Sequence, residues 1–173
     1  MKINCIVLLL ICVSLNACMG YPKQVEPVTD FEVERYLGVW YEIARLDHSF
    51  ERGLSQVTAE YTLREDGGLK VKNRGYSAED DQWKDAIGKA YFVNDKDEGY
   101  LKVSFFGPFY SSYVIFELDT DYQFAFISGA SHKYLWLLAR TPQVSDDLVQ
   151  TFIRSAEARG FDTDNLIFVD HNQ

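Results

Sequence analysis

The sequence predicts an all-β fold: an eight-stranded antiparallel up-and-down β-barrel with one C-terminal α-helix packed on its outside. Aromatic residues make up 15% of the 173 residues, and they fall in short alternating runs that turn residues separate. A period of two residues is typical of antiparallel strands with one dry face and one wet face. Eight such runs with short connections close into a barrel. A single helical pattern follows the last run.

Residues 1–17 precede the predicted fold and are typical of a secretory signal peptide. Lys2 is their only charge, and the apolar run after it is too short to cross a bilayer as a permanent helix. Leu15-Asn-Ala-Cys18 resembles a bacterial lipobox, in which lipid is attached to the cysteine thiol. We therefore expect cleavage before Cys18 and lipidation of Cys18. The alternative is an ordinary secretory signal cut near Ala17, with an incidental thiol at Cys18.

The rest of the chain is predicted to be one domain over residues 30–173, with a tether at 18–29 that lifts it off its anchor. Loss of Lys2 changes the formal net charge from −9 to −10. This balance opposes nucleic-acid binding and predicts no basic patch for anionic lipid headgroups. Because Cys5 and Cys12 leave with the signal peptide, no internal disulfide is expected.

The strands are predicted from the alternation of side chains. In the second run, Ala59 and Tyr61 share one face, whereas Thr58 and Glu60 share the other. Asp-Gly-Gly at 66–68 is the clearest hairpin connection. The predicted runs are residues 40–47, 57–64, 69–76, 85–93, 100–106, 112–119, 122–129 and 134–140.

One helix is predicted after the strands. Ser145 is a favourable N-cap, and Gly160 is a favourable stop. Phe152 and Ala156 lie on an apolar stripe at helical spacing, which favours packing against the barrel wall. A helix lying on a membrane surface is the alternative, but the polar side of this helix is not basic. The apolar run at 166–169 is expected to add an edge strand.

Three short motifs in the order Gly38-Val-Trp40, Asp119-Thr-Asp-Tyr122 and Leu135-Trp-Leu-Leu-Ala-Arg140 resemble those of the lipocalin family. The surrounding residues, from Phe31 to the C-terminus, are similar to bacterial outer-membrane lipocalins. The resemblance implies a lipid-binding barrel, and Met19 after Cys18 resembles the signal for outer-membrane rather than inner-membrane sorting.

In an up-and-down barrel these motifs come to the same end, because odd and even strands run in opposite directions. We expect the guanidinium of Arg140 to stack on the Trp40 ring there and to close the base of the barrel. These residues are expected to be structural and not catalytic. The base residues are Gly38, Trp40, Asp121, Tyr122 and Arg140.

The opposite end is expected to be the mouth, built by the turns around 48–56, 77–84, 107–111 and 130–133. Phe105 to Tyr110 places four aromatic residues around a Gly-Pro turn there. They predict a hydrophobic rim that admits an acyl chain or docks on a membrane. Alternatively, these aromatic residues fold back into the barrel or form a subunit contact in a homodimer.

A ligand cavity is predicted by counting alternate residues along each strand. The small residues Ala86, Gly88 and Ala90 share one face and leave room inside, although an eight-stranded barrel can also fill with side chains. We expect an acyl tail to pass Trp136, with the headgroup beside Tyr113, which is expected to lie nearer the mouth. The predicted lining is Ala59, Tyr61, Asn73, Phe92, Val103, Phe105, Tyr113, Ile115, Phe126, Ser128, Trp136 and Leu138.

The sequence predicts no enzyme, metal site or cofactor. It has no nucleophile elbow, phosphate-binding loop, dinucleotide fingerprint or zinc-binding helix. His48, His132 and His171 are scattered, and loop histidines are expected to be solvated. Glu42 is expected to be a buried structural charge paired near Arg140.

The resemblance implies an outer-membrane lipoprotein that binds a fatty acid, a phospholipid or a lysophospholipid for storage or transport in the cell envelope. Two alternatives remain at this point. One is a lipocalin-fold enzyme that acts on a lipid, and the other is a structural envelope lipoprotein with a filled barrel.

Overall fold

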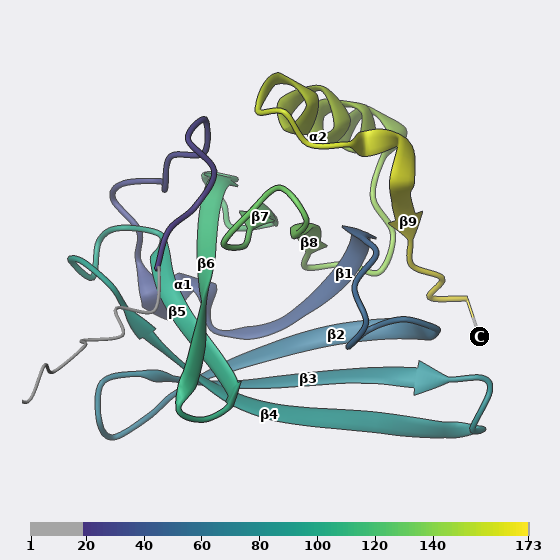
Figure 1. Cartoon of the computed structure of the whole chain (residues 1–173), viewed down its shortest axis with the longest axis horizontal. Helices are drawn as coiled ribbons and strands as arrows, with labels where there is room; N and C mark the ends of the chain where they lie inside the picture. Colours follow the sequence, from purple (N-terminus) through teal and green to yellow (C-terminus); the bar gives the residue numbers. More distant parts are fainter. Residues whose placement is uncertain (1–18, 173) are drawn as a thin grey trace, which may run out of the picture.

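The computed structural model describes residues 19–172, so the predicted signal peptide and Cys18 lie outside the described part. Strands β1 to β8 are antiparallel and close into a barrel, because β1 pairs with β2 on one side and with β8 on the other (Figure 1). The predicted fold class is thereby confirmed. The strands are β1 Gly38–Leu46, β2 Leu54–Leu63, β3 Leu69–Ser77, β4 Gln82–Phe92, β5 Tyr100–Phe106, β6 Phe109–Leu118, β7 Phe124–Ser128 and β8 Leu135–Ala139.

Four strands, β1, β2, β4 and β6, start two or three residues earlier than their alternation predicts. β2 begins at Leu54, but a β-bulge between Ser55 and Thr58 breaks its pattern, and Gln56 in this bulge has a φ of +51°. An extra residue in a strand shifts every later side chain to the other face, so the sequence signal begins only after the bulge. β4 begins at Gln82, in the long β3–β4 hairpin that projects from the barrel (Figure 1).

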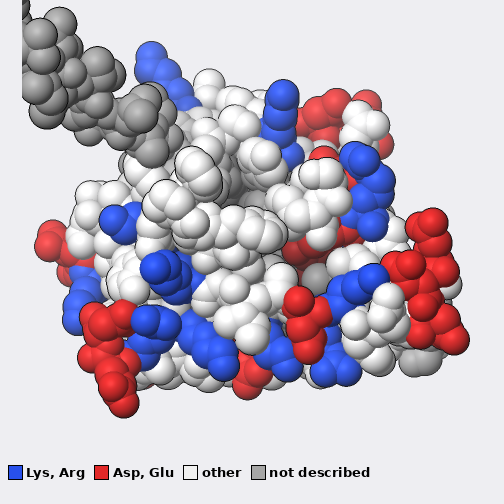
Figure 2. All heavy atoms as spheres, turned by 60° about the horizontal axis from the view of Figure 1, so that its bottom comes forward, with Lys and Arg blue, Asp and Glu red and all other residues white. Residues whose placement is uncertain are grey.

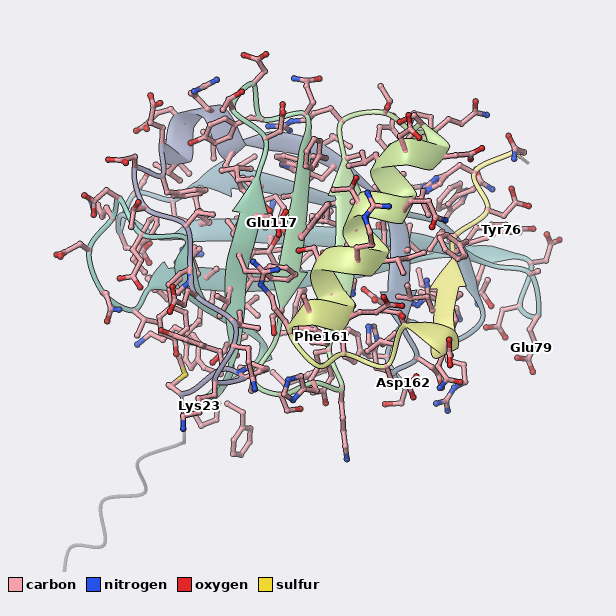
Figure 3. The ribbon with its side chains drawn as sticks, turned by 90° about the horizontal axis from the view of Figure 1, so that it is seen from above. Lys23, Tyr76, Glu79, Glu117, Phe161 and Asp162 are labelled. Carbon is pink, nitrogen blue, oxygen red and sulfur yellow. The ribbon has the colours of Figure 1, made fainter. Side chains whose placement is uncertain are left out.

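The predicted helix is α2, Asp146–Ala158, and it packs on the outside of the barrel (Figure 3). The Ser145 side chain accepts a hydrogen bond from the backbone N–H of Leu148, 3.3 Å away. Phe152 and Ala156 are fully buried against the wall. A last strand, β9 (Leu166–Phe168), pairs antiparallel with β1, which confirms the predicted edge strand. In residues 19–172, no helix is long and apolar enough to cross a membrane.

The prediction that Phe126 and Ser128 face the cavity is wrong. Phe126 belongs to the apolar layer between the wall and α2, where its ring centroid lies 5.0 Å from that of Phe152. Ser128 lies two residues further along the same face of β7. Tyr122 has a φ of +58°, so side-chain alternation cannot be counted through this turn into β7. The interior residues of β7 are Ala125 and Ile127.

The predicted tether does not act as a free spacer over residues 19–29. Val25 is fully buried on the outside of the barrel, and Val28 lies between two neighbouring segments. Its backbone N–H donates to the carbonyl of Ile115 at 2.9 Å, and its carbonyl accepts from Gly99 at 2.8 Å. The chain then forms the short helix α1, Val33–Tyr36, which the sequence analysis did not predict.

Candidate ligand-binding site

The base of the barrel is closed by the Trp40–Arg140 pair. The guanidinium of Arg140 lies 3.9 Å from the centroid of the Trp40 ring, and the predicted stacking is therefore present. The same guanidinium donates to the backbone carbonyls of Arg35 (2.7 Å), Val39 (2.9 Å) and Tyr122 (3.2 Å). These bonds join α1, β1 and the β6–β7 turn, so the base is held as one unit.

Two further residues of the base, Gly38 and Asp121, contribute to its structure through their backbone atoms. Gly38 has a φ of +93°, which favours glycine at the start of β1. Asp121 is exposed, and its backbone N–H donates to the side chain of Asp119, which organises the turn. The Trp40 indole N–H donates to the carbonyl of Tyr36 at 2.8 Å, so the buried indole is satisfied.

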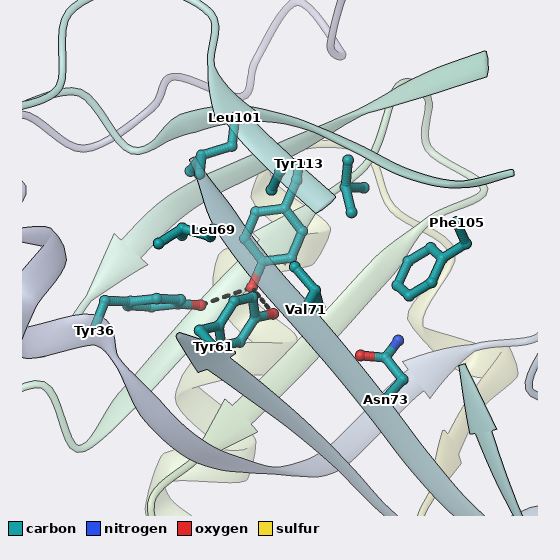
Figure 4. A pocket seen from close by; sticks show the side chains of 10 residues that line it. Tyr36, Tyr61, Leu69, Val71, Asn73, Leu101, Phe105 and Tyr113 are labelled. Atoms are coloured by element: carbon teal, nitrogen blue, oxygen red, sulfur yellow. Dashed lines mark hydrogen bonds between the residues drawn. The ribbon is translucent and has the colours of Figure 1, made fainter. Parts of the chain in front are cut away.

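A cavity of about 60 Å³ lies inside the barrel between the base and the middle of the wall (Figure 4). Its surface is almost entirely apolar. The lining residues are Tyr36, Tyr61, Leu69, Val71, Asn73, Ala90, Leu101, Val103, Phe105 and Tyr113.

Three tyrosine hydroxyls meet at the base end of the cavity. The Tyr113 hydroxyl lies 2.7 Å from that of Tyr36 and 2.8 Å from that of Tyr61 (Figure 4). Burial raises the pKa of all three phenols above the ordinary value of 10.0, so they remain neutral hydroxyls at physiological pH. Tyr36 comes from α1, close to the base. Tyr113 therefore lies deep in the barrel, and the prediction that it lies nearer the mouth is wrong.

The other predicted lining residues face the interior as expected. Tyr61, Asn73, Val103, Phe105 and Tyr113 line the cavity itself. Ala59, Phe92, Ile115, Trp136 and Leu138 belong to the same interior layer without lining it.

Sequence reasoning placed Ala90 on the inner face of its strand but missed Tyr36, Leu69, Val71 and Leu101 as cavity residues. For three of them a signal was available, because Leu69 and Val71 alternate with Asn73, and Leu101 alternates with Val103 on β5. Tyr36 has no such signal, since it lies on α1 before the first strand.

A buried charged cluster occupies the mouth half of the barrel. The Arg45 guanidinium donates to Oε1 of Glu42 at 2.7 Å and to the carbonyl of Glu51 at 2.9 Å. Glu51 lies on the β1–β2 loop, and its carboxylate accepts from the Trp136 indole at 3.2 Å. Nε2 of His48 lies 3.2 Å from the same carboxylate. The side chains of Glu42, Arg45, His48 and Glu51 are all buried.

This cluster corrects two expectations. Glu42 is a buried structural charge, but its partner is Arg45 and not Arg140. His48 is only 7% exposed and packs between Phe50 and Trp136, so it is not a solvated loop histidine. Trp136, at the start of β8, therefore lies under the mouth loop.

The cluster contains strongly perturbed ionisable groups. Burial, and then the neighbouring Glu51 carboxylate, raises the pKa of Glu42 well above its ordinary value. Burial also raises the pKa of Glu51. Burial, and then the nearby Arg45, lowers the pKa of His48 to about 4, so His48 is neutral at neutral pH. These directions favour one shared negative charge on the two glutamates, facing the positive charge of Arg45.

The aromatic residues at the rim of the mouth point in different directions. Phe105 points into the cavity, whereas Phe106 and Phe109 are 80% and 78% exposed at the tip of the β5–β6 hairpin. The alternative that the aromatic residues fold back therefore holds for Phe105 alone. Among residues 19–172, no group of three His, Cys, Asp or Glu side chains could hold a metal ion.

Comparison with known proteins agrees with this geometry. Residues 31–171 match the model of the lipocalin-like domain family. The outer membrane lipoprotein Blc of Vibrio cholerae is 62% identical over 165 residues, which cover 95% of this chain and 96% of that protein. The protein of the same name from Escherichia coli K12 is 49% identical over 148 residues, covering 86% and 84% of the two chains.

Among solved structures, insecticyanin from the tobacco hornworm Manduca sexta superposes with a TM-score of 0.71 at 19% identity, covering 90% of this chain and 88% of that one. This likeness concerns the fold. The family match and the two bacterial relatives cover nearly the whole described chain, and this protein therefore belongs to the lipocalin family.

Proposed function

We propose that the protein is an outer-membrane lipoprotein that holds a lipid with one acyl chain in its barrel, for storage or transport in the cell envelope. Fatty acids and lysophospholipids are the ligand classes that we favour over phospholipids with two chains. The observation that carries the proposal is the apolar cavity inside a barrel that is closed at its base.

The chemistry of the cavity supports an amphiphile. Leu69, Val71, Leu101, Val103 and Phe105 offer apolar contacts over most of its surface. Oδ1 of Asn73 is buried without a hydrogen-bond partner in residues 19–172, and it can accept a bond from a ligand hydroxyl. Lysophospholipids carry a free hydroxyl on the glycerol backbone, whereas both of these backbone hydroxyls are acylated in diacyl phospholipids.

The size of the cavity favours one chain over two. Ligand pockets typically measure about 300–1,000 Å³, whereas the free space here is about 60 Å³. Uptake of a whole tail thus requires lining side chains to move, and Phe105 at the mouth side is the first in its path. A second tail would need the same displacement again.

The small volume also favours a second candidate, a structural envelope lipoprotein whose barrel stays filled. Extraction of lipid from the purified protein, read by mass spectrometry, separates the two candidates. We expect one single-chain lipid per barrel, and ligand-free protein would support the structural candidate. A chemically altered lipid after incubation would instead indicate an enzyme.

A variant that fills the cavity provides the matched control. Ala90→Leu extends three carbon atoms into the free space, so we expect it to reduce the amount of extracted lipid at least fivefold. Ala158→Leu adds the same atoms at the exposed end of α2 and should extract as much lipid as the wild type. Equal lipid content in the two variants would contradict binding in this cavity.

Membrane attachment is the second part of the proposal. The bacterial relatives are named outer membrane lipoproteins, and the sequence around Cys18 predicts acylation. Each buried methylene contributes about 0.8 kcal/mol, so several acyl chains hold a protein firmly. Cys18→Ser should release the protein from the outer-membrane fraction or leave it unprocessed. A variant that still fractionates with the outer membrane as a mature protein would place the anchor elsewhere.

A further inference from the structure

A basic surface covers the outer face of β3, β4 and β5, although the protein as a whole carries a net charge of −9. Figure 2 shows Lys and Arg side chains gathered in a band across this wall, with uncharged side chains beside it. The prediction of no basic patch from the net charge alone is therefore wrong. The basic residues of this surface, which we call the basic face, are Lys70, Lys72, Arg74, Lys89 and Lys102.

Most of the positive charges of the basic face have no acidic partner within the described part of the protein. Lys70 and Lys89 are direct cross-strand partners, and two like charges in this position disfavour the sheet. Lys70, Lys89 and Lys102 form no salt bridge with any residue of the described part. Among residues 19–172, Asp85 is the only carboxylate in salt-bridge contact with the basic face, 3.7 Å from Lys72 and 3.9 Å from Arg74.

Exposed apolar side chains accompany the basic residues. Ile87 projects outward between them on β4 and is 60% exposed. The ammonium groups of Lys89 and Lys102 lie 5.8 Å and 5.4 Å from the centroid of the Tyr110 ring. Tyr110 continues directly into the exposed hairpin tip with Phe106 and Phe109. Lysine ammonium groups beside protruding aromatic residues suit a surface that is anionic outside and apolar beneath.

The start of the described chain lies against the first residue of β5, the strand that carries Lys102. The ring of Tyr21 packs edge-on against Tyr100, with centroids 5.0 Å apart. Tyr100 precedes Lys102 by two residues, so both project from the same outer face of β5. Three residues of chain span at most about 10 Å, so an acyl anchor on Cys18 would keep a bilayer close to this wall.

We propose that the basic face and the Phe106–Phe109 hairpin tip dock on the surface of an anionic phospholipid bilayer. The mouth of the barrel, whose rim includes this hairpin, is then held against the bilayer, where single-chain lipids can enter or leave. The proposal goes beyond lipid binding and rests on the proposed anchor only for the proximity of the membrane.

The test measures vesicle binding without the anchor. The full mature chain with Cys18→Ser is mixed with vesicles of phosphatidylcholine alone or with about a third phosphatidylglycerol, and the bound fraction is read by flotation. Each lysine near an anionic surface contributes about a fivefold change in partitioning. We therefore expect Lys70→Gln with Lys89→Gln to weaken binding to the anionic vesicles about 25-fold.

The matched control is Lys96→Gln with Arg154→Gln, because both residues are exposed and lie away from the basic face and the mouth, in the β4–β5 turn and on α2. It makes the same change in net charge and should alter binding less than twofold. Phe109→Ser should weaken binding to both kinds of vesicle. Binding that ignores the anionic lipid, or that falls equally in the control, would overturn the proposal.

Two further readouts keep the result unambiguous. A dimer that the Lys70→Gln, Lys89→Gln variant disrupts, with vesicle binding unchanged, would make the basic face an interface between copies and overturn docking. Lysophospholipid uptake by the same variant in solution should equal that of the wild type. If neither the wild type nor the variants take up lysophospholipid, the proposed function is contradicted. The measured vesicle binding would still test the docking proposal.

Discussion

The two halves of the barrel interior each depend on an arginine, but the two arginines have different partners. At the base, Arg140 stacks on Trp40 and donates to three backbone carbonyls. In the mouth half, Arg45 is 1% exposed and donates to the carboxylate of Glu42 and to the backbone carbonyl of Glu51, whose own carboxyl group is buried in the same cluster. At the base the partners of the arginine are neutral groups, whereas in the mouth half they include carboxyl groups that titrate.

This difference separates a permanent closure from an adjustable one. Carbonyls and an indole ring do not titrate in the physiological range, so a change of pH there leaves the contacts that close the base unchanged. A buried ion pair depends on protonation, and removal of one partner leaves an uncompensated charge. The β1–β2 loop is bound to the barrel through Glu51, so the mouth is the end where conditions can change access to the cavity.

The largest effect is expected from Arg45→Met. The variant leaves two buried carboxyl groups without their cation, which typically costs about 3–5 kcal/mol of unfolding free energy. Urea unfolding followed by circular dichroism measures this loss.

The double variant Arg45→Met, Glu42→Gln is the control for the mouth cluster. It should recover part of the loss, because one of the unpaired carboxyl groups is gone. A loss below about 1 kcal/mol for the single variant would contradict a buried, paired Arg45.

Arg140→Ala tests the base and should cost about 2–3 kcal/mol. The variant loses one cation–π contact, worth about 0.5–2 kcal/mol, and hydrogen bonds worth about 1 kcal/mol each, part of which water replaces at this half-exposed site. Because no acid or base titrates with Arg140 at the base, the loss should be the same at pH 5 and pH 8. A loss that changes with pH would contradict the contrast between the two halves.

His48→Gln tests the pH dependence of the mouth. The pKa of His48 in the folded protein is about 4, below the ordinary value of 6.5, so the unfolded chain binds a proton first. The wild type should therefore lose stability relative to the variant as the pH falls from about 6.5 to about 4. We expect a change of about 1–2 kcal/mol over this window. Parallel stability curves for the two proteins would show that His48 is not held neutral.

Much of the fold follows from the sequence, because alternation survives wherever a strand is regular. The errors fall at backbone irregularities. Counting through the turn at Tyr122, which has a positive φ, reversed β7 and put Phe126 and Ser128 on the wrong face. The bulge after Ser55 concealed the start of β2. Such features depend on how neighbouring strands meet, which a single chain's pattern does not display.

The site was predicted less fully than the fold, for a related reason. The faces of Trp136 and Tyr113 follow from alternation, but their depth depends on where each side chain leans and on which loop covers it. The Arg45 cluster was missed because Glu51 comes from a loop that has no periodicity. The basic face was missed because Lys89 and Lys102 join the three basic residues of β3 only through strand pairing, and because acidic residues outnumber basic ones over the whole chain.

The smallest effect concerns Tyr113→Phe, and it tests which end of the ligand lies deep in the barrel. The variant removes the hydroxyl that joins Tyr36 and Tyr61, at about 1 kcal/mol of stability. If an acyl tail occupies the cavity, the headgroup remains in the mouth half, away from this hydroxyl. Affinities for a fatty acid and for the matching lysophospholipid should then fall by the same factor, about twofold or less. Titration followed by tryptophan fluorescence, to which Trp136 contributes, measures both affinities.

Glu51→Gln is the counterpart at the mouth, because it keeps the acceptor for the Trp136 indole and removes the charge. It should change the ratio of the two affinities, since only the lysophospholipid carries a large headgroup near this loop. A selective loss of lysophospholipid affinity in Tyr113→Phe, with an unchanged ratio in Glu51→Gln, would place the headgroup at the base. That result would reverse the direction of binding and assign the tyrosine hydroxyls to ligand recognition.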